Sequence, residues 1–137
     1  MSLSKLRPMT FESLEDRRLM AGSIELDGGV VEINGTNLAD VATVRQINGG
    51  LVQVTLQNGG ETLMRTYNAS QINSIEFYGG DGNDHFQNIS NIRSTAYGGE
   101  GHDLLRGGTN VDRLFGGGGN DDIDGGRGYD FIRGENG

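Results

Sequence analysis

The sequence predicts an all-β fold with a thin core, and three observations lead to this prediction. Residues 22–78 alternate apolar and polar side chains with the two-residue period of strands. Residues 79–137 repeat a glycine-rich unit every nine residues. Gly occurs 25 times in 137 residues while apolar residues make up only 34% of the chain, which is too little to fill a thick globular core.

The strands expected in residues 22–78 are short. Asn-Gly and Asp-Gly steps lie between them, and these residues tolerate the positive φ angles of tight turns. The expected strands are Ser23–Leu26, Val30–Ile33, Val41–Val44, Leu51–Leu56 and Ile75–Phe77.

The repeat of residues 79–137 follows the pattern G-G-x-G-x-D-x-U-x, in which U is a large apolar residue. One unit begins at Gly79, and after an irregular stretch over residues 88–97, four uninterrupted units run from Gly98 to Arg133. The first six positions suit a turn, because glycine has no Cβ to penalise left-handed backbone. Asn110 replaces one fourth-position glycine, and Asn is the other residue that best tolerates this geometry.

The U positions supply one inward-facing apolar side chain for every nine residues. Burying one such side chain contributes about 1.5–3 kcal/mol, whereas ordering the backbone costs about 1–2 kcal/mol for each residue. Hydrophobic burial alone therefore cannot stabilise these coils, and a bound ligand is expected to contribute. The U residues are Phe86, Leu105, Leu114, Ile123 and Ile132.

Charge and residue usage limit what the ligand and other partners can be. A net charge of −8 and a pI of about 4.6 argue against nucleic-acid binding and fit hard cations bound through oxygen. The absence of cysteine excludes disulfides and thiolate metal sites. No apolar run approaches the ~20 residues of a membrane span, and Leu19–Ala21 is too short for a secretory signal core.

The nonapeptide pattern resembles the calcium-binding repeats of the RTX (repeats-in-toxin, haemolysin-type) family. The resemblance implies a parallel β-roll, a calcium-binding β-solenoid in which each coil takes two nonapeptides. It also implies a Ca²⁺ ion between successive turns on one edge. The earlier turn would give its Asp and the carbonyls of positions one and three, and the next turn its Asp and the carbonyls of positions two and four. Six oxygens suit calcium, which takes 6–8 such ligands.

Carried over to this chain, the resemblance implies three complete calcium sites. The first combines Gly79, Asp81 and Asp84 with Gly99, Gly101 and Asp103. The second combines Gly98, Glu100 and Asp103 with Gly117, Gly119 and Asp121. The third, on the opposite edge, combines Gly107, Thr109 and Asp112 with Gly126, Gly128 and Asp130. Asp81 and Glu100 would act through their carbonyls.

Two further positions are expected to bind calcium weakly or not at all. A fourth site around Gly116, Gly118 and Asp121 lacks its second Asp, and the irregular turn at Asn88–Arg93 has no acid.

The repeats lead us to interpret residues 22–78 as a β-rich cap or as degenerate coils of the solenoid, since terminal solenoid units are commonly atypical. Gly35–Ala42 loosely resembles one repeat in which two of the glycines are missing. An independent sandwich is the alternative, although it would be short of strands and core.

Residues 1–21 form a third segment, with several basic residues and the only proline. Phe11–Met20 resembles the LEPR-x-LL-like N-terminal motif of exported planctomycete proteins, although Asp16-Arg17 stands where that motif has Pro-Arg. A flexible amphipathic tail is the alternative interpretation.

The sequence thus predicts a non-catalytic, secreted or cell-surface module whose folding is driven by calcium. Neither H-E-x-x-H nor G-x-S-x-G occurs, and His85 and His102 fall at variable repeat positions. The alternatives are an adhesion or self-assembly protein in which calcium is only scaffolding, and a non-catalytic module of a larger secreted enzyme. Calcium ions are the expected partners, and end-to-end self-association or a cell-surface protein partner is also considered.

An 18-residue coil would place Arg113 beside Phe131 and Phe115 beside Arg133 in one sheet, and Arg106 beside Asp124 in the other. Cation–π contacts are then expected on the first sheet. We interpret these as surface pairing, with a docking face for another protein as the alternative.

Overall fold

The computed structural model describes residues 22–136, and strands make up nearly all of its regular structure. The prediction of an all-β fold is confirmed. No helix among the described residues is long and apolar enough to span a membrane. The elements are β1 (Ser23–Asp27), β2 (Val30–Asn34), β3 (Asp40–Ile47), β4 (Leu51–Asn58), β5 (Glu61–Asn68), the 3₁₀ helix η1 (Ala69–Gln71), β6 (Ser74–Tyr78), β7 (His85–Ile89), β8 (Ser94–Tyr97), β9 (Leu104–Arg106), β10 (Asp112–Phe115), β11 (Asp122–Asp124) and β12 (Phe131–Arg133).

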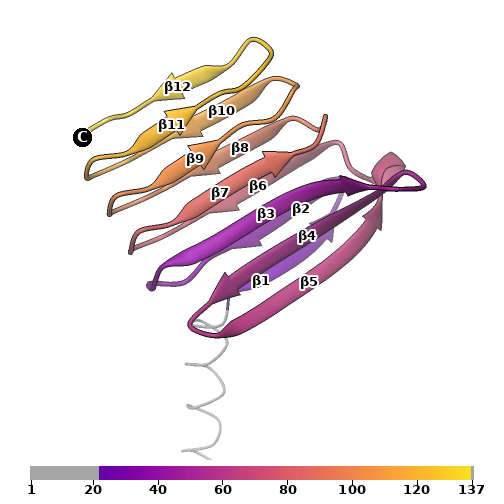
Figure 1. Cartoon of the computed structure of the whole chain (residues 1–137), viewed down its shortest axis with the longest axis horizontal. Coiled ribbons are helices and arrows are strands. Elements are labelled where there is room, and N and C mark those ends of the chain that lie inside the picture. The colour runs from indigo at the N-terminus through magenta and orange to yellow at the C-terminus, as the bar shows by residue number, and fades with distance from the viewer. Residues whose placement is uncertain (1–21, 137) are drawn as a thin grey trace, which may run out of the picture.

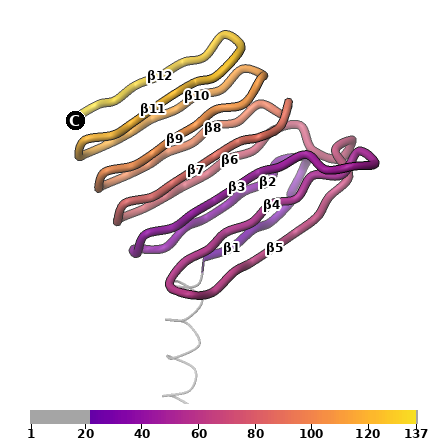
Figure 2. The backbone as a smooth tube through the Cα atoms, viewed as in Figure 1, coloured from indigo at the N-terminus to yellow at the C-terminus, as the bar shows by residue number. Residues whose placement is uncertain are grey.

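Two six-stranded sheets face each other (Figure 1). Sheet A has the order β1-β2-β6-β8-β10-β12, and sheet B has the order β11-β9-β7-β3-β4-β5. From β6 onward the chain alternates between the sheets, crossing at every turn (Figure 2). The strand pairs there are parallel, whereas β1–β2, β3–β4 and β4–β5 are antiparallel, so both sheets are mixed.

Residues 22–78 belong to the same two sheets as the repeats. Strand β2 pairs with β6 and β3 pairs with β7, both in parallel. Between β3 and β6 the chain inserts β4 and β5, which extend sheet B at its far end, and the short helix η1. The N-terminal strands therefore continue the stack that the repeats form.

Two strands of the structure, β5 and β8, were not predicted from the sequence. Strand β5 is rich in polar and charged residues and is largely exposed, so its hydrophobic pattern is weak. Strand β8 lies in the stretch interpreted as irregular, and its Ser94 and Ala96 are small inward-facing residues in place of a large apolar one. Both strands are defined by pairing with neighbouring strands, which local pattern does not report.

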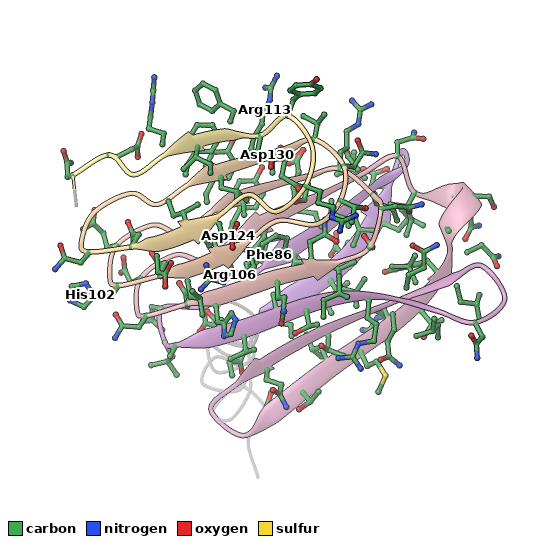
Figure 3. The ribbon with its side chains drawn as sticks, turned by 45° about the horizontal axis from the view of Figure 1, so that its top comes forward. Phe86, His102, Arg106, Arg113, Asp124 and Asp130 are labelled. Carbon is green, nitrogen blue, oxygen red and sulfur yellow. The ribbon has the colours of Figure 1, made fainter. Side chains whose placement is uncertain are left out.

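The core lies between the sheets. Phe77 and Phe86 stack there with ring centroids 5.1 Å apart, and Phe86 is enclosed between the two layers (Figure 3). Leu105 and Leu114 are also fully buried, as expected for U positions. Ile132 departs from this pattern and is 49% exposed, because β12 ends sheet A and reaches beyond β11, the last strand of sheet B.

Candidate functional site

Four turns lie above one another on the edge where sheet A leads into sheet B. They span residues 35–40, 79–84, 98–103 and 116–121. Each begins with a glycine whose N–H donates to the carbonyl at the end of the next sheet A strand, as Gly79 does to Tyr97 at 2.8 Å and Gly98 to Phe115 at 2.8 Å. The strand register thus continues into the turns and fixes their spacing.

An aspartate ends each of these turns, and the aspartates form a ladder. The N–H of Asp40 donates to Oδ1 of Asp84 at 2.8 Å, that of Asp84 to Oδ1 of Asp103 at 2.8 Å, and that of Asp103 to Oδ1 of Asp121 at 2.9 Å. Asp40, Asp84 and Asp103 are buried. The carboxylates of Asp84, Asp103 and Asp121 therefore each use Oδ1 to satisfy the backbone of the preceding turn.

The second carboxylate oxygen of the ladder has no such partner. Oδ2 of Asp84, Asp103 and Asp121 is buried and accepts no hydrogen bond. A buried oxygen without a donor costs free energy, more so when it carries charge. These atoms are the part of the structure that a cation would satisfy.

A main-chain carbonyl lies close to Oδ2 of Asp84, and another lies close to Oδ2 of Asp103. A Cβ built on Gly79 would lie 2.5 Å from Oδ2 of Asp84 and 2.6 Å from the carbonyl oxygen of Gly98. A Cβ built on Gly98 would meet Oδ2 of Asp103 and, at 2.8 Å, the carbonyl oxygen of Gly116. Glycine at the first position thus keeps open a space lined by a carboxylate and a carbonyl, which is the donor set of a hard cation.

The electrostatics of the ladder also favour a bound cation. Burial is the main cause that raises the pKa of Asp84 from about 3.8 to about 8, and the Asp40 and Asp103 carboxylates add to this, against the lowering effect of the Asp40 N–H. Burial likewise raises the pKa of Asp103 to about 6. Within residues 22–136 the ion pairs are those of Arg106 with Asp122 and Asp124, so no basic side chain pairs with the ladder.

The opposite edge carries a shorter aspartate ladder with a different pattern of hydrogen bonds. The N–H of Asp112 donates to Oδ1 of Asp130 at 2.9 Å, and the N–H and hydroxyl of Ser94 donate to Oδ1 of Asp112. Oδ2 of Asp112 accepts the N–H of Gly108 at 2.8 Å. Burial raises the pKa of Asp112, while the Ser94 and Gly108 donors lower it.

The family model of the RTX calcium-binding nonapeptide repeat matches four copies in this chain, at residues 76–87 and 97–132. These segments are RTX calcium-binding repeats. Neither a curated protein nor a solved structure matches the chain. The resemblance of Phe11–Met20 to an export motif lies outside the described residues.

The structure places the predicted ligands of the RTX repeats on neighbouring turns. Residues 79–84 lie against residues 99–103, residues 98–103 against 117–121, and residues 107–112 against 126–130. Among the described residues no three His, Cys, Asp or Glu side chains form a cluster. The carboxylates instead occur as successive rungs, with main-chain carbonyls between them.

Asn110 corrects one detail of the sequence interpretation. Glu135 is the one non-glycine residue with positive φ in the described part of the chain, so Asn110 is not left-handed. Its side chain instead accepts the Val111 N–H at 2.7 Å and donates to the Asn91 carbonyl at 2.9 Å. Gly108 is not left-handed either, whereas the corresponding Gly99 has a φ of 89°. The turn at 107–112 thus differs in conformation from the other RTX turns.

The irregular turn over residues 88–93 is satisfied by its own side chains. The Ser90 hydroxyl donates to Oδ1 of Asn88 at 2.6 Å and accepts the N–H of Ile92 at 3.2 Å, while Nδ2 of Asn88 donates to the Ile92 carbonyl at 2.8 Å. Neutral polar groups here replace the acid of an RTX turn.

The turn at residues 35–40 belongs to the ladder although it lies outside the matched repeats. Asp40 occupies the first rung, yet its Oδ2 accepts the Thr36 N–H at 2.6 Å, and the Thr36 hydroxyl lies 3.1 Å from its Oδ1. Sequence analysis did not include Asp40 among the site residues. The available signal was a glycine and an aspartate five positions apart, as in every RTX turn.

His102 takes part in hydrogen bonds between neighbouring turns. Nδ1 of His102 accepts the N–H of Asn120 at 2.8 Å, and the N–H of His102 in turn donates to Oδ1 of Asn83 at 2.8 Å. His102 therefore links successive turns on the outside of the ladder.

Proposed function

We propose that this chain is a calcium-binding module whose RTX repeats fold as a parallel β-roll around Ca²⁺ ions. The observation that carries the proposal is the set of three stacked, buried carboxylate oxygens without a hydrogen-bond donor, at Asp84, Asp103 and Asp121. A dication between successive turns would compensate their charge and coordinate these oxygens.

Calcium fits this donor set better than the other common metals. All candidate ligands are carboxylate and carbonyl oxygens, and thiolate ligands are excluded because the chain has no cysteine. Magnesium requires near-octahedral geometry at shorter distances and retains water, whereas calcium accepts six to eight oxygens in flexible arrangements.

The residues proposed to hold the ions are those predicted from the repeats, in three sites. Asp84 and Asp103 would share the first ion, Asp103 and Asp121 the second, and Asp112 and Asp130 the third. The third site differs from the others because the Gly108 N–H already donates a hydrogen bond to Oδ2 of Asp112. We therefore expect this site to bind calcium more weakly.

Residues 22–78 are proposed to act as a cap that does not depend on calcium. The first rung of the ladder, Asp40, is satisfied by Thr36. The strands of this segment also contribute much of the buried core, including Val31, Ile33, Val44, Val54 and Leu56. Stable cap strands next to charged, thin coils would give the repeats a template on which to order when calcium binds.

We also propose a location outside the cell, where calcium is abundant enough to fill weak sites. Calcium sites in extracellular modules bind with dissociation constants of roughly 10⁻⁴–10⁻³ M. Repeats of this affinity would remain disordered at cytosolic calcium levels and would order on secretion, as a secreted or cell-surface module requires.

The test is a calcium titration of the full chain followed by far-UV circular dichroism, with magnesium as the matched control. We expect β-sheet signal to rise with calcium, with a midpoint of roughly 10⁻⁴–10⁻³ M, and little response to magnesium. An unchanged spectrum, or an equal response to both ions, would overturn the proposal.

A further inference from the structure

We propose that the outer face of sheet A binds the same face of a second copy of this chain. The acidic half of each face would then lie over the basic half of the other. The surface, called here the striped face, consists of the outward-facing residues of β2, β6, β8, β10 and β12. Two adjacent rows of side chains cross these strands, and both rows contribute to the proposal.

The first row is divided by charge. The strand register aligns Glu32 and Glu76 with Thr95 and then with Arg113. Acidic side chains thus occupy the β2–β6 half of the face, and Arg113 (Figure 3) occupies the β10 half. The second row continues this division, because Arg133 lies on β12.

These charges are not paired with one another. Within the described part of the chain, Arg113 and Arg133 form no ion pair. Two strand spacings, about 10 Å, separate Glu76 from Arg113. The outer face of sheet B differs, since Arg106 forms its salt bridge with Asp122 across neighbouring strands at 3.2 Å. The striped face therefore keeps opposite charges apart and free to meet a partner.

The second row is an exposed aromatic ladder. Tyr78 and Tyr97 stack at 5.2 Å, and Tyr97 and Phe115 stack at 5.0 Å. Phe131 stands beside Arg113 in the first row, and its tilted ring lies 5.7 Å from that of Phe115. Tyr78, Tyr97 and Phe131 are 38%, 40% and 49% exposed. A contiguous strip of exposed aromatic side chains is typical of protein interaction sites.

Stacking in the ladder argues for a protein partner over a carbohydrate. The ring faces, which a sugar would cover, are already occupied by the neighbouring rings, so mainly ring edges point outward. Ring edges carry partial positive charge and favour contact with other aromatic rings and with carboxylates. The striped face itself offers both kinds of group.

A two-fold axis parallel to the strands and passing over β8 makes the face self-complementary. This operation exchanges β6 with β10 and β2 with β12 and keeps each row opposite itself. Glu76 of one copy then faces Arg113 of the other, Tyr97 faces its own counterpart, and Tyr78 faces Phe115. Each such charge pair occurs twice, as an isologous interface requires.

A hollow at the basic end would receive the acidic end of the second copy. It has a volume of about 340 Å³ and is lined by Arg113, Phe115, Phe131 and Arg133. In the opposite half of the face, the Tyr78 hydroxyl donates to Glu76 at 2.6 Å. The two-fold axis places this Tyr78–Glu76 pair over the hollow.

The size of the face sets the expected strength of the dimer. Five strands at spacings of about 4.8 Å give a surface about 20 Å across. Two such faces bury less than the ~1,200 Å² of a standard stable complex. We therefore expect a weak dimer in fast exchange with the monomer, and one that is sensitive to salt.

The experiment is sedimentation velocity of the full chain over a range of concentrations, at roughly millimolar calcium. We expect the wild type to sediment faster as its concentration rises. Glu76→Arg and Arg113→Glu should each weaken self-association by about tenfold or more, because each places like charges opposite one another twice. An equimolar mixture of the two variants should associate again, since each new charge then meets its opposite.

The mixture distinguishes this arrangement from other kinds of association. Recovery in the mixture requires that the altered faces of the two variants meet each other, as the two-fold arrangement predicts. Gln87→Arg, which adds the same charge on the outer face of sheet B, serves as the control and should leave association unchanged. A monomeric wild type, or an association that neither charge reversal weakens, would overturn the proposal, as would a failure of the mixture to associate.

Discussion

The main-chain N–H of Asp84 donates to Oδ1 of Asp103 at 2.8 Å, while Oδ2 of both residues lies buried without a donor. One carboxylate oxygen thus aligns successive turns, and the other is left for a ligand. This division of roles connects the register of the strands with cation binding, because the hydrogen bond that stacks the coils also orients the free oxygen.

Replacing Asp103 by Asn should weaken calcium binding more than any other single loss of a carboxylate. Asp103 lies between Asp84 and Asp121 in the ladder and is proposed to contribute to two ions. We expect the calcium midpoint of the β-sheet signal to rise by about tenfold or more, since one charged ligand is lost from each site. Isothermal titration calorimetry of the same variant should show fewer or weaker sites.

Asp81→Asn is the matched control for this variant. Its side chain is exposed and it is proposed to act only through its carbonyl, so the same change of charge should leave the midpoint within about twofold. Equal effects of the two substitutions would contradict the ladder as the ion-binding element.

Acidification should stabilise the calcium-free repeats. The folded-state pKa of Asp84 is raised to about 8 and that of Asp103 to about 6, above their ordinary value near 3.8. At pH values between 3.8 and about 8, the folded chain therefore binds more protons than the unfolded chain. The stability that protonation contributes is lost as pH rises toward 8. Far-UV circular dichroism in a chelator, at a series of pH values across this window, should show a β-sheet signal that falls with rising pH.

Calcium should reverse the sign of this pH dependence. The ion binds ionised carboxylates, so protons compete with it and calcium affinity should increase as pH rises through the same window. Asp84→Asn, which mimics the protonated acid, should flatten the pH dependence of the calcium-free protein. A pH dependence that Asp84→Asn leaves unchanged would show that another group is responsible.

The sequence could predict the turns better than the strands that connect them. The glycine and aspartate positions are set by local backbone and ligand chemistry, so they can be recognised in each repeat. The repeat length also set the strand register, and the predicted pairing of Arg113 with Phe131 and of Arg106 with Asp124 is confirmed. The cation–π contact found is Arg133 over Phe131 within one strand, at 5.7 Å, because the aromatic rings stack on one another across the strands.

Non-local pairing accounts for what the sequence did not reveal. Strand β5 is held by β4, and β8 is held between β6 and β10, although neither has a strong pattern of its own. Asp40 joins the ladder only because β3 pairs with β7 across an insertion of two strands. The left-handed geometry expected at Asn110 was wrong because contacts to Asn91 and Val111 favour a different turn.

Gly79→Ala should impair the first calcium site without straining the backbone. Gly79 does not have positive φ, but a Cβ there would lie 2.5 Å from Oδ2 of Asp84 and 2.6 Å from the Gly98 carbonyl oxygen. The methyl group would occupy the space proposed for coordination, and overpacking costs about 1–3 kcal/mol. Calcium titration by circular dichroism should show a higher midpoint and a smaller amplitude.

Gly49→Ala provides the complementary control. Gly49 has a φ of 79° with nothing within 4 Å of a built Cβ, in the turn between β3 and β4. Its substitution should destabilise the fold by about 1–2 kcal/mol through backbone strain and leave the calcium midpoint unchanged. A shifted midpoint in Gly49→Ala would mean that general stability, not the space beside Gly79, controls calcium binding.

Thr36→Ala should destabilise the cap even without calcium. The Thr36 hydroxyl lies 3.1 Å from Oδ1 of Asp40 and accepts the Leu38 N–H at 3.0 Å, and both Thr36 and Asp40 are buried. Its removal leaves the half-buried Leu38 N–H and the buried Asp40 carboxylate less well satisfied, at a cost of about 1–3 kcal/mol. Urea unfolding of the full chain in a chelator measures this loss.

Thr66→Ala on the exposed face of β5 is the control for Thr36→Ala. An exposed substitution of this kind should change stability by no more than about 0.5 kcal/mol. Calcium should not rescue Thr36→Ala if the first rung is satisfied by side chains. Full rescue by calcium at the concentration that orders the repeats would instead mean that an ion binds at Asp40, and that the cap depends on the metal as the repeats do.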